Sequence, residues 1–181
     1  MSEYKRAEIN EDILIQRIAL DDREAFQCLY SRLYRSVYAY ALTILKNRED
    51  AEDVAQDCFL KIRAAAHTYQ PQGKAQAWIF TIARNLCQMK FRQSQKLTGV
   101  DMDDMANQLV FDPDTDISLK LTLTAAFKVL NDQEHQIIVL HAVSDIKFAD
   151  IARIVKLPLA TVLSKYYRAL SKLRKELEGK L

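Results

Sequence analysis

Apolar residues recur at helical spacing through most of the chain. They occur at intervals of three and four over 26–44, where Asp21 and Asp22 precede the run as candidate N-caps. Two further runs, 49–65 and 78–89, also keep their apolar side chains on one face when drawn as helices. The pattern predicts three amphipathic helices in a first domain.

The periodicity stops over 98–118, where six aspartates occur with no Lys or Arg. It resumes over 119–130 and 134–143, and Asn131 stands three residues before Glu134 as in a capping box. A short helix, a turn and a long helix then follow over 148–155, 156–158 and 159–177, the spacing of a helix-turn-helix. We therefore expect an all-α chain with two small helical domains, residues 1–96 and 119–181, joined by an acidic flexible linker over 97–118.

Composition supports the helical prediction. The 181 residues include only three Gly and three Pro, whereas average usage would supply roughly 13 and 9. A β-sandwich needs these residues at its turns, and a doubly wound nucleotide-binding fold needs glycines where the backbone meets phosphate. Both folds are excluded, while 49% hydrophobic residues are enough to bury two cores.

The N-terminus and the cysteines indicate a cytoplasmic protein. The first residues carry charges throughout and lack the apolar stretch of a signal peptide. The longest nearly apolar run, Val37 to Leu45, has nine residues, against the roughly 20 of a membrane-spanning helix. We expect no direct membrane insertion, and we interpret Cys28, Cys58 and Cys87 as reduced core thiols.

The formal net charge of +2 is small because acidic and basic segments of the chain offset each other. Residues 49–57 hold five acids and no base, the linker holds six acids, and residues 156–175 hold six bases and no acid. Opposite patches attract opposite surfaces, so the segregation predicts one basic and one polyanionic partner.

The acidic second helix is a candidate docking surface for a basic protein. Opposite its apolar stripe lie Glu49, Asp53, Gln56 and Leu60, with Glu52 and Asp57 on the flanks. The carboxylates would steer the encounter and Leu60 would supply an apolar anchor. The alternative is a solvated face with one exposed leucine.

The third helix combines aromatic, cationic and amide side chains, including Phe80, Arg84, Gln88 and Phe91. Unpaired bases stack on aromatic rings while cations hold the backbone, so this face suits single-stranded nucleic acid. The preceding loop adds polar and aromatic side chains. Core packing against another helix is the alternative for both phenylalanines.

The final helix is a candidate reader of duplex DNA. We expect its inward residues to be Leu159, Val162, Tyr166, Ala169 and Leu173. Its outward face is small, polar and cationic, and includes Thr161, Ser164, Arg168 and Lys172. Short side chains allow close approach in a major groove, and cations reach phosphates. A surface helix packed on a bundle is the alternative.

Nothing in the sequence indicates catalysis. It has no HExxH motif and no phosphate-cradling glycine loop, and His67, His135 and His141 form no obvious constellation. We expect a protein that is not an enzyme, with no cofactor, no metal and no small-molecule substrate.

Five segments resemble the extracytoplasmic-function class of bacterial sigma factors, a branch of the sigma-70 family. DREAFQCLYSRLYRSVYAYALTIL (22–45), NREDAEDVAQDCFLKI (47–62) and AWIFTIARNLCQMKFR (77–92) resemble region 2. LNDQEHQIIVLHAV (130–143) and FADIARIVKLPLATVLSKYYRALSKLRKEL (148–177) resemble region 4.

The resemblance implies a transcription initiation factor that binds core RNA polymerase, through its clamp helices and flap, and promoter DNA as duplex and as single strand. It implies polymerase docking by Glu49, Glu52, Asp53, Gln56, Asp57 and Leu60. It implies minus-ten recognition and melting by Tyr69, Lys74, Phe80, Arg84, Asn85, Gln88 and Arg92. It implies minus-thirty-five recognition by Lys156, Thr161, Ser164, Lys165, Arg168 and Lys172. The class is often held inactive by an anti-sigma factor, a further expected partner, and the linker would thread the RNA channel of the polymerase.

Three positions depart from the family pattern. Lys156 stands in the turn where Gly is common, Lys147 precedes the short helix where Ser is usual, and Leu163 replaces a frequent basic residue. We expect weaker capping at the first two positions.

Two other functions fit parts of the sequence. A stand-alone helix-turn-helix regulator would explain the C-terminal half, and a helical adaptor would use only the acidic helix. A repressor would bind a palindrome as a dimer, whereas a sigma factor would bind core polymerase as a single copy.

Overall fold

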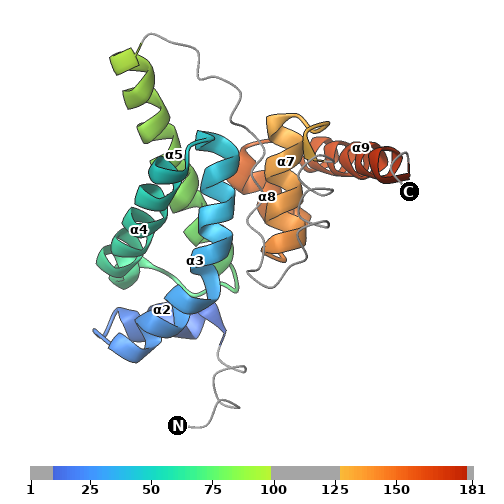
Figure 1. Cartoon of the computed structure of the whole chain (residues 1–181). Coiled ribbons are helices and arrows are strands. Elements are labelled where there is room, and N and C mark those ends of the chain that lie inside the picture. The colour runs from blue at the N-terminus through green and yellow to red at the C-terminus, as the bar shows by residue number, and fades with distance from the viewer. Residues whose placement is uncertain (1–9, 99–126, 179–181) are drawn as a thin grey trace.

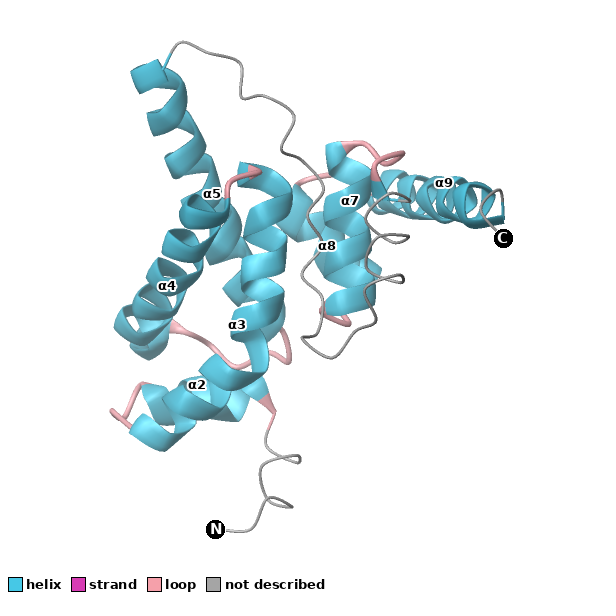
Figure 2. Ribbon diagram, in the orientation of Figure 1, coloured by secondary structure: helices cyan, strands magenta, loops and turns pink. Residues whose placement is uncertain are grey.

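The computed structural model describes residues 10–98 and 127–178, and every regular element in these ranges is helical (Figure 2). The prediction of an all-α chain is confirmed. The expected linker lies almost entirely outside the described residues, as does most of the helix expected over 119–130. None of the helices in the described ranges is long and apolar enough to cross a membrane.

Within residues 10–98, four α-helices form the N-terminal bundle (Figure 1). They are α2 (Glu11–Ile18), α3 (Arg23–Leu45), α4 (Arg48–Ala65) and α5 (Ala75–Thr98), and the short 3-10 turn η1 (Ala66–Thr68) follows α4. Helix α3 packs against α2, α4 and α5, so it forms the centre of this bundle.

Local capping explains where these helices start. The side chain of Asp22 accepts a hydrogen bond from the Ala25 N–H, and Asn47 does the same for Asp50. Asp22 is thus confirmed as an N-cap, because a short polar side chain satisfies a backbone N–H that has no partner within the helix. Asp21 instead adopts a positive φ of 60° in the turn before α3.

Helix α2 is an element that the sequence analysis missed. Its buried residues are Leu14, Ile15 and Ile18, and the Asn10 side chain caps it by accepting from the Ile13 N–H at 3.0 Å. The spacing of these apolar residues behind an Asn was the available signal.

In the described part of the C-terminal bundle, the helices are α7 (Asp132–Ile138), α8 (Phe148–Val155) and α9 (Leu159–Glu178). The capping box predicted at Asn131 and Glu134 is present, with both hydrogen bonds formed. The expected helix to residue 143 is instead α7 followed by a π-helical turn, Val139–Val143.

The helix-turn-helix forms as expected. Lys156 ends α8 in the left-handed region at φ 57°, and Lys147 precedes α8 without a side-chain cap. Both departures from the family pattern therefore fall at cap positions. A Ser before the helix would accept a backbone hydrogen bond, and a Gly after it would avoid the Cβ penalty of the left-handed region.

The two bundles pack against each other. Helix α5 contacts α8, and α3 contacts α7 and the π-helical turn (Figure 1). The main hydrophobic core is continuous across this contact, since it includes Leu45 and Ala83 from one bundle and Ile137 and Ile154 from the other. The C-terminal domain therefore lies against the face of α5 that the sequence analysis assigned to DNA.

Candidate nucleic-acid and polymerase interfaces

The acidic face of α4 is exposed. Leu60 keeps 62% of its surface accessible, and the acidic and amide side chains around it are also exposed: Glu49, Glu52, Asp53, Gln56 and Asp57. The apolar stripe on the other side, including Val54, Cys58 and Ile62, is buried against α3 and α5. A row of carboxylates around one exposed leucine can attract a basic protein surface and bury an anchor there.

Two acids of α4 interact with α5. The Lys90 ammonium lies 3.1 Å from Asp50 and 3.0 Å from Asp53. The hydrogen bonds to Asp53 and Asp50 raise the pKa of Lys90. Asp53 is therefore partly neutralised within the protein, and Glu52 and Asp57 are the acids of this face better suited to a partner.

The loop before α5 is held in place by α2. The Tyr69 hydroxyl donates a hydrogen bond to Asp12 Oδ1, and the Gly73 N–H donates to the same oxygen. The Tyr69 ring lies 4.9 Å, centroid to centroid, from the Trp78 ring. Of the two loop residues predicted to bind DNA, Tyr69 is half-buried and Lys74 is exposed.

The prediction for Phe80 is wrong. Its side chain is fully buried and its ring packs edge-on against Tyr40, 5.6 Å between centroids. Helix α5 contacts α3 and α4 on one side and α8 on another, so its buried stripe is wider than the single face assumed from periodicity. A ring enclosed in the core offers no surface on which a base can stack.

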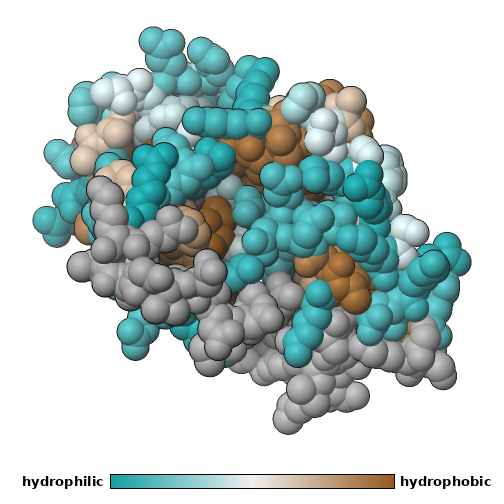
Figure 3. Space-filling model, turned by 90° about the horizontal axis from the view of Figure 1, so that it is seen from above, coloured by the Kyte–Doolittle hydropathy of each residue, from teal (hydrophilic) through white to brown (hydrophobic). Residues whose placement is uncertain are grey.

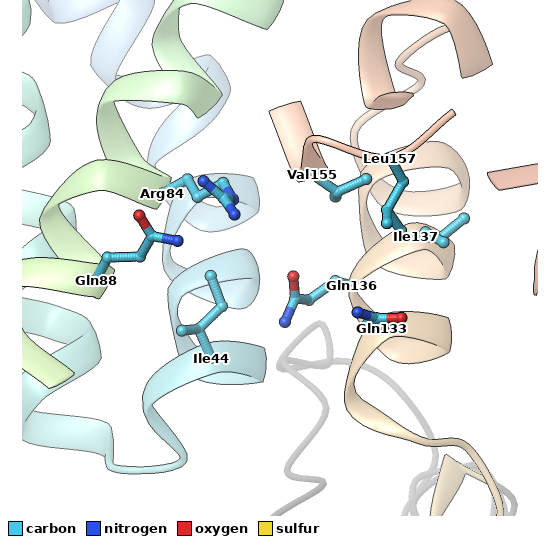
Figure 4. Close-up of a pocket in the computed structure, with 8 residues that line it drawn as sticks. All are labelled: Ile44, Arg84, Gln88, Gln133, Gln136, Ile137, Val155 and Leu157. Carbon is cyan, nitrogen blue, oxygen red and sulfur yellow. The ribbon is translucent and has the colours of Figure 1, made fainter. Parts of the chain in front are cut away.

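The other α5 residues predicted to bind DNA are accessible to different degrees. Asn85 and Arg92 are exposed. Arg84 and Gln88 are half-buried and line a cavity of about 180 Å³ between the bundles. Figure 4 shows Arg84, Gln88 and Ile44 on one side of this cavity, opposite Val155 and Leu157. The remaining lining residues, Gln133, Gln136 and Ile137, come from α7.

Helix α9 and the turn before it expose half of the six residues predicted to read duplex DNA. Lys156, Ser164 and Arg168 are exposed, while Thr161 and Lys165 are half-buried. Val162 and Ala169 are buried as expected. Leu159, the first residue of α9, was expected to point inward but is 45% exposed.

Lys172 has a partner within the protein. Its ammonium lies 2.7 Å from Glu134 Oε2, and the Glu134 side chain is fully buried. Burial alone would raise the pKa of Glu134, but Lys172 and the Asn131 N–H hold it below the ordinary value. Lys172 therefore neutralises a buried carboxylate and ties α9 to α7, which leaves it less available to DNA than Arg168.

The cysteines are free thiols, as predicted. Cys58 and Cys87 are buried, and burial raises the pKa of each thiol to about 12. Cys28 is only half-buried. Across the described ranges, no group of three or more His, Cys, Asp or Glu side chains is arranged to hold a metal ion.

The face of the molecule seen in Figure 3 shows separate apolar patches among hydrophilic residues. Among the exposed large hydrophobic residues are Leu20, Leu60 and Tyr167, which belong to different parts of the fold. Charge and exposure on α4, α5 and α9 therefore define the candidate interfaces better than hydrophobicity does.

Comparison with known proteins identifies the class. Residues 29–97 match the family model of Sigma-70 region 2, and residues 120–173 match that of Sigma-70 region 4. The chain belongs to the sigma-70 family, in its extracytoplasmic-function class. It is an alternative sigma factor of transcription initiation, and the stand-alone regulator, which would explain only the C-terminal half, is not favoured.

Similar proteins span nearly the whole chain. The ECF RNA polymerase sigma factor SigW of Bacillus subtilis is 26% identical over 176 residues, which cover 90% of this chain and 94% of SigW. SigK of Mycobacterium tuberculosis is 26% identical over 170 residues, 90% of this chain and 91% of SigK.

Two solved structures share the fold. CnrH, in complex with the cytosolic domain of CnrY, aligns with a TM-score of 0.65 at 21% identity, over 94% of this chain and 99% of CnrH. The sigma factor RpoE of Bartonella quintana, in complex with the anti-sigma factor NepR, aligns with a TM-score of 0.69 at 22% identity, over 84% of this chain and 96% of RpoE.

Proposed function

We propose that α4 docks this chain on core RNA polymerase, that α9 reads the minus-thirty-five element as duplex, and that the 69–74 loop with α5 captures the unpaired minus-ten strand. The observation that carries the proposal is the separation of charge: an exposed acidic face with Leu60 lies on one domain, and an exposed basic helix lies on the other. The first suits a basic protein, and the second suits phosphate.

We further propose that the chain itself catalyses no reaction. Sigma factors are not enzymes, and nucleotide addition belongs to the polymerase. Opening would be driven by capture, because a flipped base loses stacking in the duplex and regains part of it on the protein. The polymerase and its promoters are cytoplasmic, so the chain would act there.

The packing of the two bundles bears on DNA binding. Arg84 and Gln88 face the C-terminal domain across the cavity, so a strand held by these side chains would displace that domain from α5. An anti-sigma factor is the expected regulator, because CnrH and RpoE are each in complex with a partner, CnrY and the anti-sigma factor NepR. Such a regulator would compete with DNA for the form of the chain in which the C-terminal domain has moved away from α5.

Run-off transcription with purified core polymerase and a fragmented genomic pool tests the function. The chain should direct initiation from a limited set of fragments that core alone does not use, and their sequences would define the promoter. Transcription no different from that of core alone would refute the proposal.

The docking face is tested by Glu52→Lys with Asp57→Lys. These acids are exposed and make no ion pair among the described contacts, so reversing them should abolish core binding while preserving the fold. Glu24→Lys, at an exposed acid of α3 outside this face, is the control. Equal core affinity in both variants would exclude α4 as the docking helix.

A further inference from the structure

Asp12 joins two distant parts of the N-terminal bundle. It lies in the first turn of α2, before the residues that match the region 2 family, and one of its oxygens accepts two hydrogen bonds from the 69–74 loop. The Tyr69 hydroxyl is 2.5 Å from Oδ1 and the Gly73 nitrogen is 3.2 Å from it. The loop is thus attached near its start and near its end to the same atom.

Both donors are suited to this contact. Burial and the hydrogen bond to Asp12 raise the pKa of Tyr69, so its hydroxyl stays protonated and donates. Gly73 adopts a φ of 66°, a conformation that side-chain-bearing residues rarely adopt, and a Cβ there would meet nothing within 4 Å. The glycine is therefore required by the backbone turn rather than by crowding.

The attachment restricts the loop before any DNA is bound. Without the contact to Asp12, the six-residue loop would lose conformational entropy when it binds DNA. The anchored loop has already lost that entropy during folding. The Tyr69 ring is confined further by Trp78, and Lys74, one residue after Gly73, stays exposed at the start of α5.

We propose that Asp12 is a positioning residue for promoter opening, which holds the 69–74 loop in the geometry that captures an unpaired minus-ten base. The inference rests on the proposed function of this loop. It makes α2 part of the opening machinery although Asp12 itself touches no DNA.

Hydrogen exchange on the full chain tests the anchor without DNA. Asp12→Ala should speed exchange of the Gly73 amide and of the 69–74 segment by about tenfold or more, because both lost hydrogen bonds run to a carboxylate oxygen and such a bond contributes at least that factor. Glu11→Ala removes the neighbouring first-turn acid of the same helix and should leave the loop unchanged. Unchanged Gly73 exchange in Asp12→Ala would overturn the anchor.

Promoter opening by the reconstituted holoenzyme tests the consequence. The probe is a promoter fragment recovered from the run-off pool, and opening is followed by the permanganate reactivity of minus-ten thymines. Asp12→Ala should open about tenfold more slowly while closed-complex affinity stays at the wild-type value. Asp12→Asn keeps an acceptor oxygen at this position and should restore most of the rate.

Tyr69→Phe provides a second route that leaves α2 intact, because it removes only the donor and keeps the ring beside Trp78. It should slow opening less than Asp12→Ala, since the Gly73 contact remains. Opening at the wild-type rate in Asp12→Ala, despite faster loop exchange, would overturn the positioning role. A wild-type chain that opens no promoter with core would overturn the proposed function and this inference together, while leaving the exchange result in place.

Discussion

The ammonium of Lys46 lies 2.9 Å from the carboxylate of Asp132. Lys46 is the C-cap of α3, in the left-handed region at φ 55°, and Asp132 is the first residue of α7. The pair therefore connects the two domains at the end of one helix and the start of another, and the shared core, which includes Ile137 of α7, joins them as well.

Reversing Asp132 to Lys should separate the domains more often. An exposed pair of this kind contributes only about 0 to 1 kcal/mol, but the reversal replaces attraction by repulsion between two ammonium groups. Fluorescence energy transfer between dyes on α4 and α9 should report a larger mean distance. The charge-swapped pair, Lys46→Asp with Asp132→Lys, should recover the wild-type distance, and no recovery would mean that the ion pair does not hold the domains.

Arg168 and Lys172 should respond differently to substitution. Arg168→Ala should weaken binding to a minus-thirty-five duplex by about 1 to 3 kcal/mol if its guanidinium reaches a base edge. The free energy of unfolding should be unchanged, since Arg168 is exposed. An equal loss of affinity for every DNA sequence would mean that Arg168 contacts only phosphate.

Lys172→Met should instead lower the free energy of unfolding, by about 1 to 3 kcal/mol, because it leaves the buried Glu134 carboxylate without its ammonium partner. Urea unfolding of the full chain measures this. Adding Glu134→Gln to Lys172→Met removes the unpaired charge and should recover part of the loss. Full stability with weakened DNA binding in Lys172→Met would assign Lys172 to the DNA instead.

His135 should make the C-terminal domain sensitive to acid. Its ring is buried next to Phe127, 5.1 Å between centroids, and Nε2 has no hydrogen-bond partner. Burial lowers the pKa of His135 to about 4, below the unfolded value of about 6.5. The unfolded chain therefore binds the proton more tightly, and stability is lost as pH falls from about 6.5 towards 4.

The expected loss between pH 7 and pH 5 is about 2 kcal/mol, measured by urea unfolding. His135→Leu should remove most of this pH dependence, whereas His67→Leu, at an exposed histidine, should keep it. Identical pH profiles for wild type and His135→Leu would show that protonation of His135 does not limit stability.

Lys156→Gly should stabilise the helix-turn-helix. Lys156 occupies the left-handed region at φ 57°, where Gly avoids the Cβ penalty, so we expect a gain of about 0.5 to 1 kcal/mol in the free energy of unfolding. Lys46→Gly relieves the same backbone strain but loses the contact with Asp132, so its gain should be smaller. A destabilised Lys156→Gly would mean that this side chain contributes to folding.

Local rules predicted much of the fold. The bounds of α8, the start of α9 and the capping box at Asn131 were correct because each depends on residues within one or two turns of the chain. Helix α2 could have been predicted in the same way from its cap and apolar spacing. The resemblance of five segments to sigma factors was carried by the same local patterns.

The candidate sites were harder to predict because exposure depends on which helices meet. Periodicity gives each helix one buried face, but α5 is covered by helices on more than one side, which places Phe80 in the core and Arg84 in a cavity between domains. The partners of Lys172 and Tyr69 lie 38 and 57 residues away in the chain, beyond any local rule.

The sequence by itself therefore determined the helical class, the helix-turn-helix and the segregation of acidic from basic surfaces, since these follow from residue type and spacing within single helices. Only the tertiary structure decided which charged side chains remain exposed and which are paired within the protein. It also decided that Asp12 holds the 69–74 loop and that the two domains share a core. The physical reason is that burial and ion pairing are set by contacts between helices distant in the chain, and the periodicity of one helix carries no information about its neighbours.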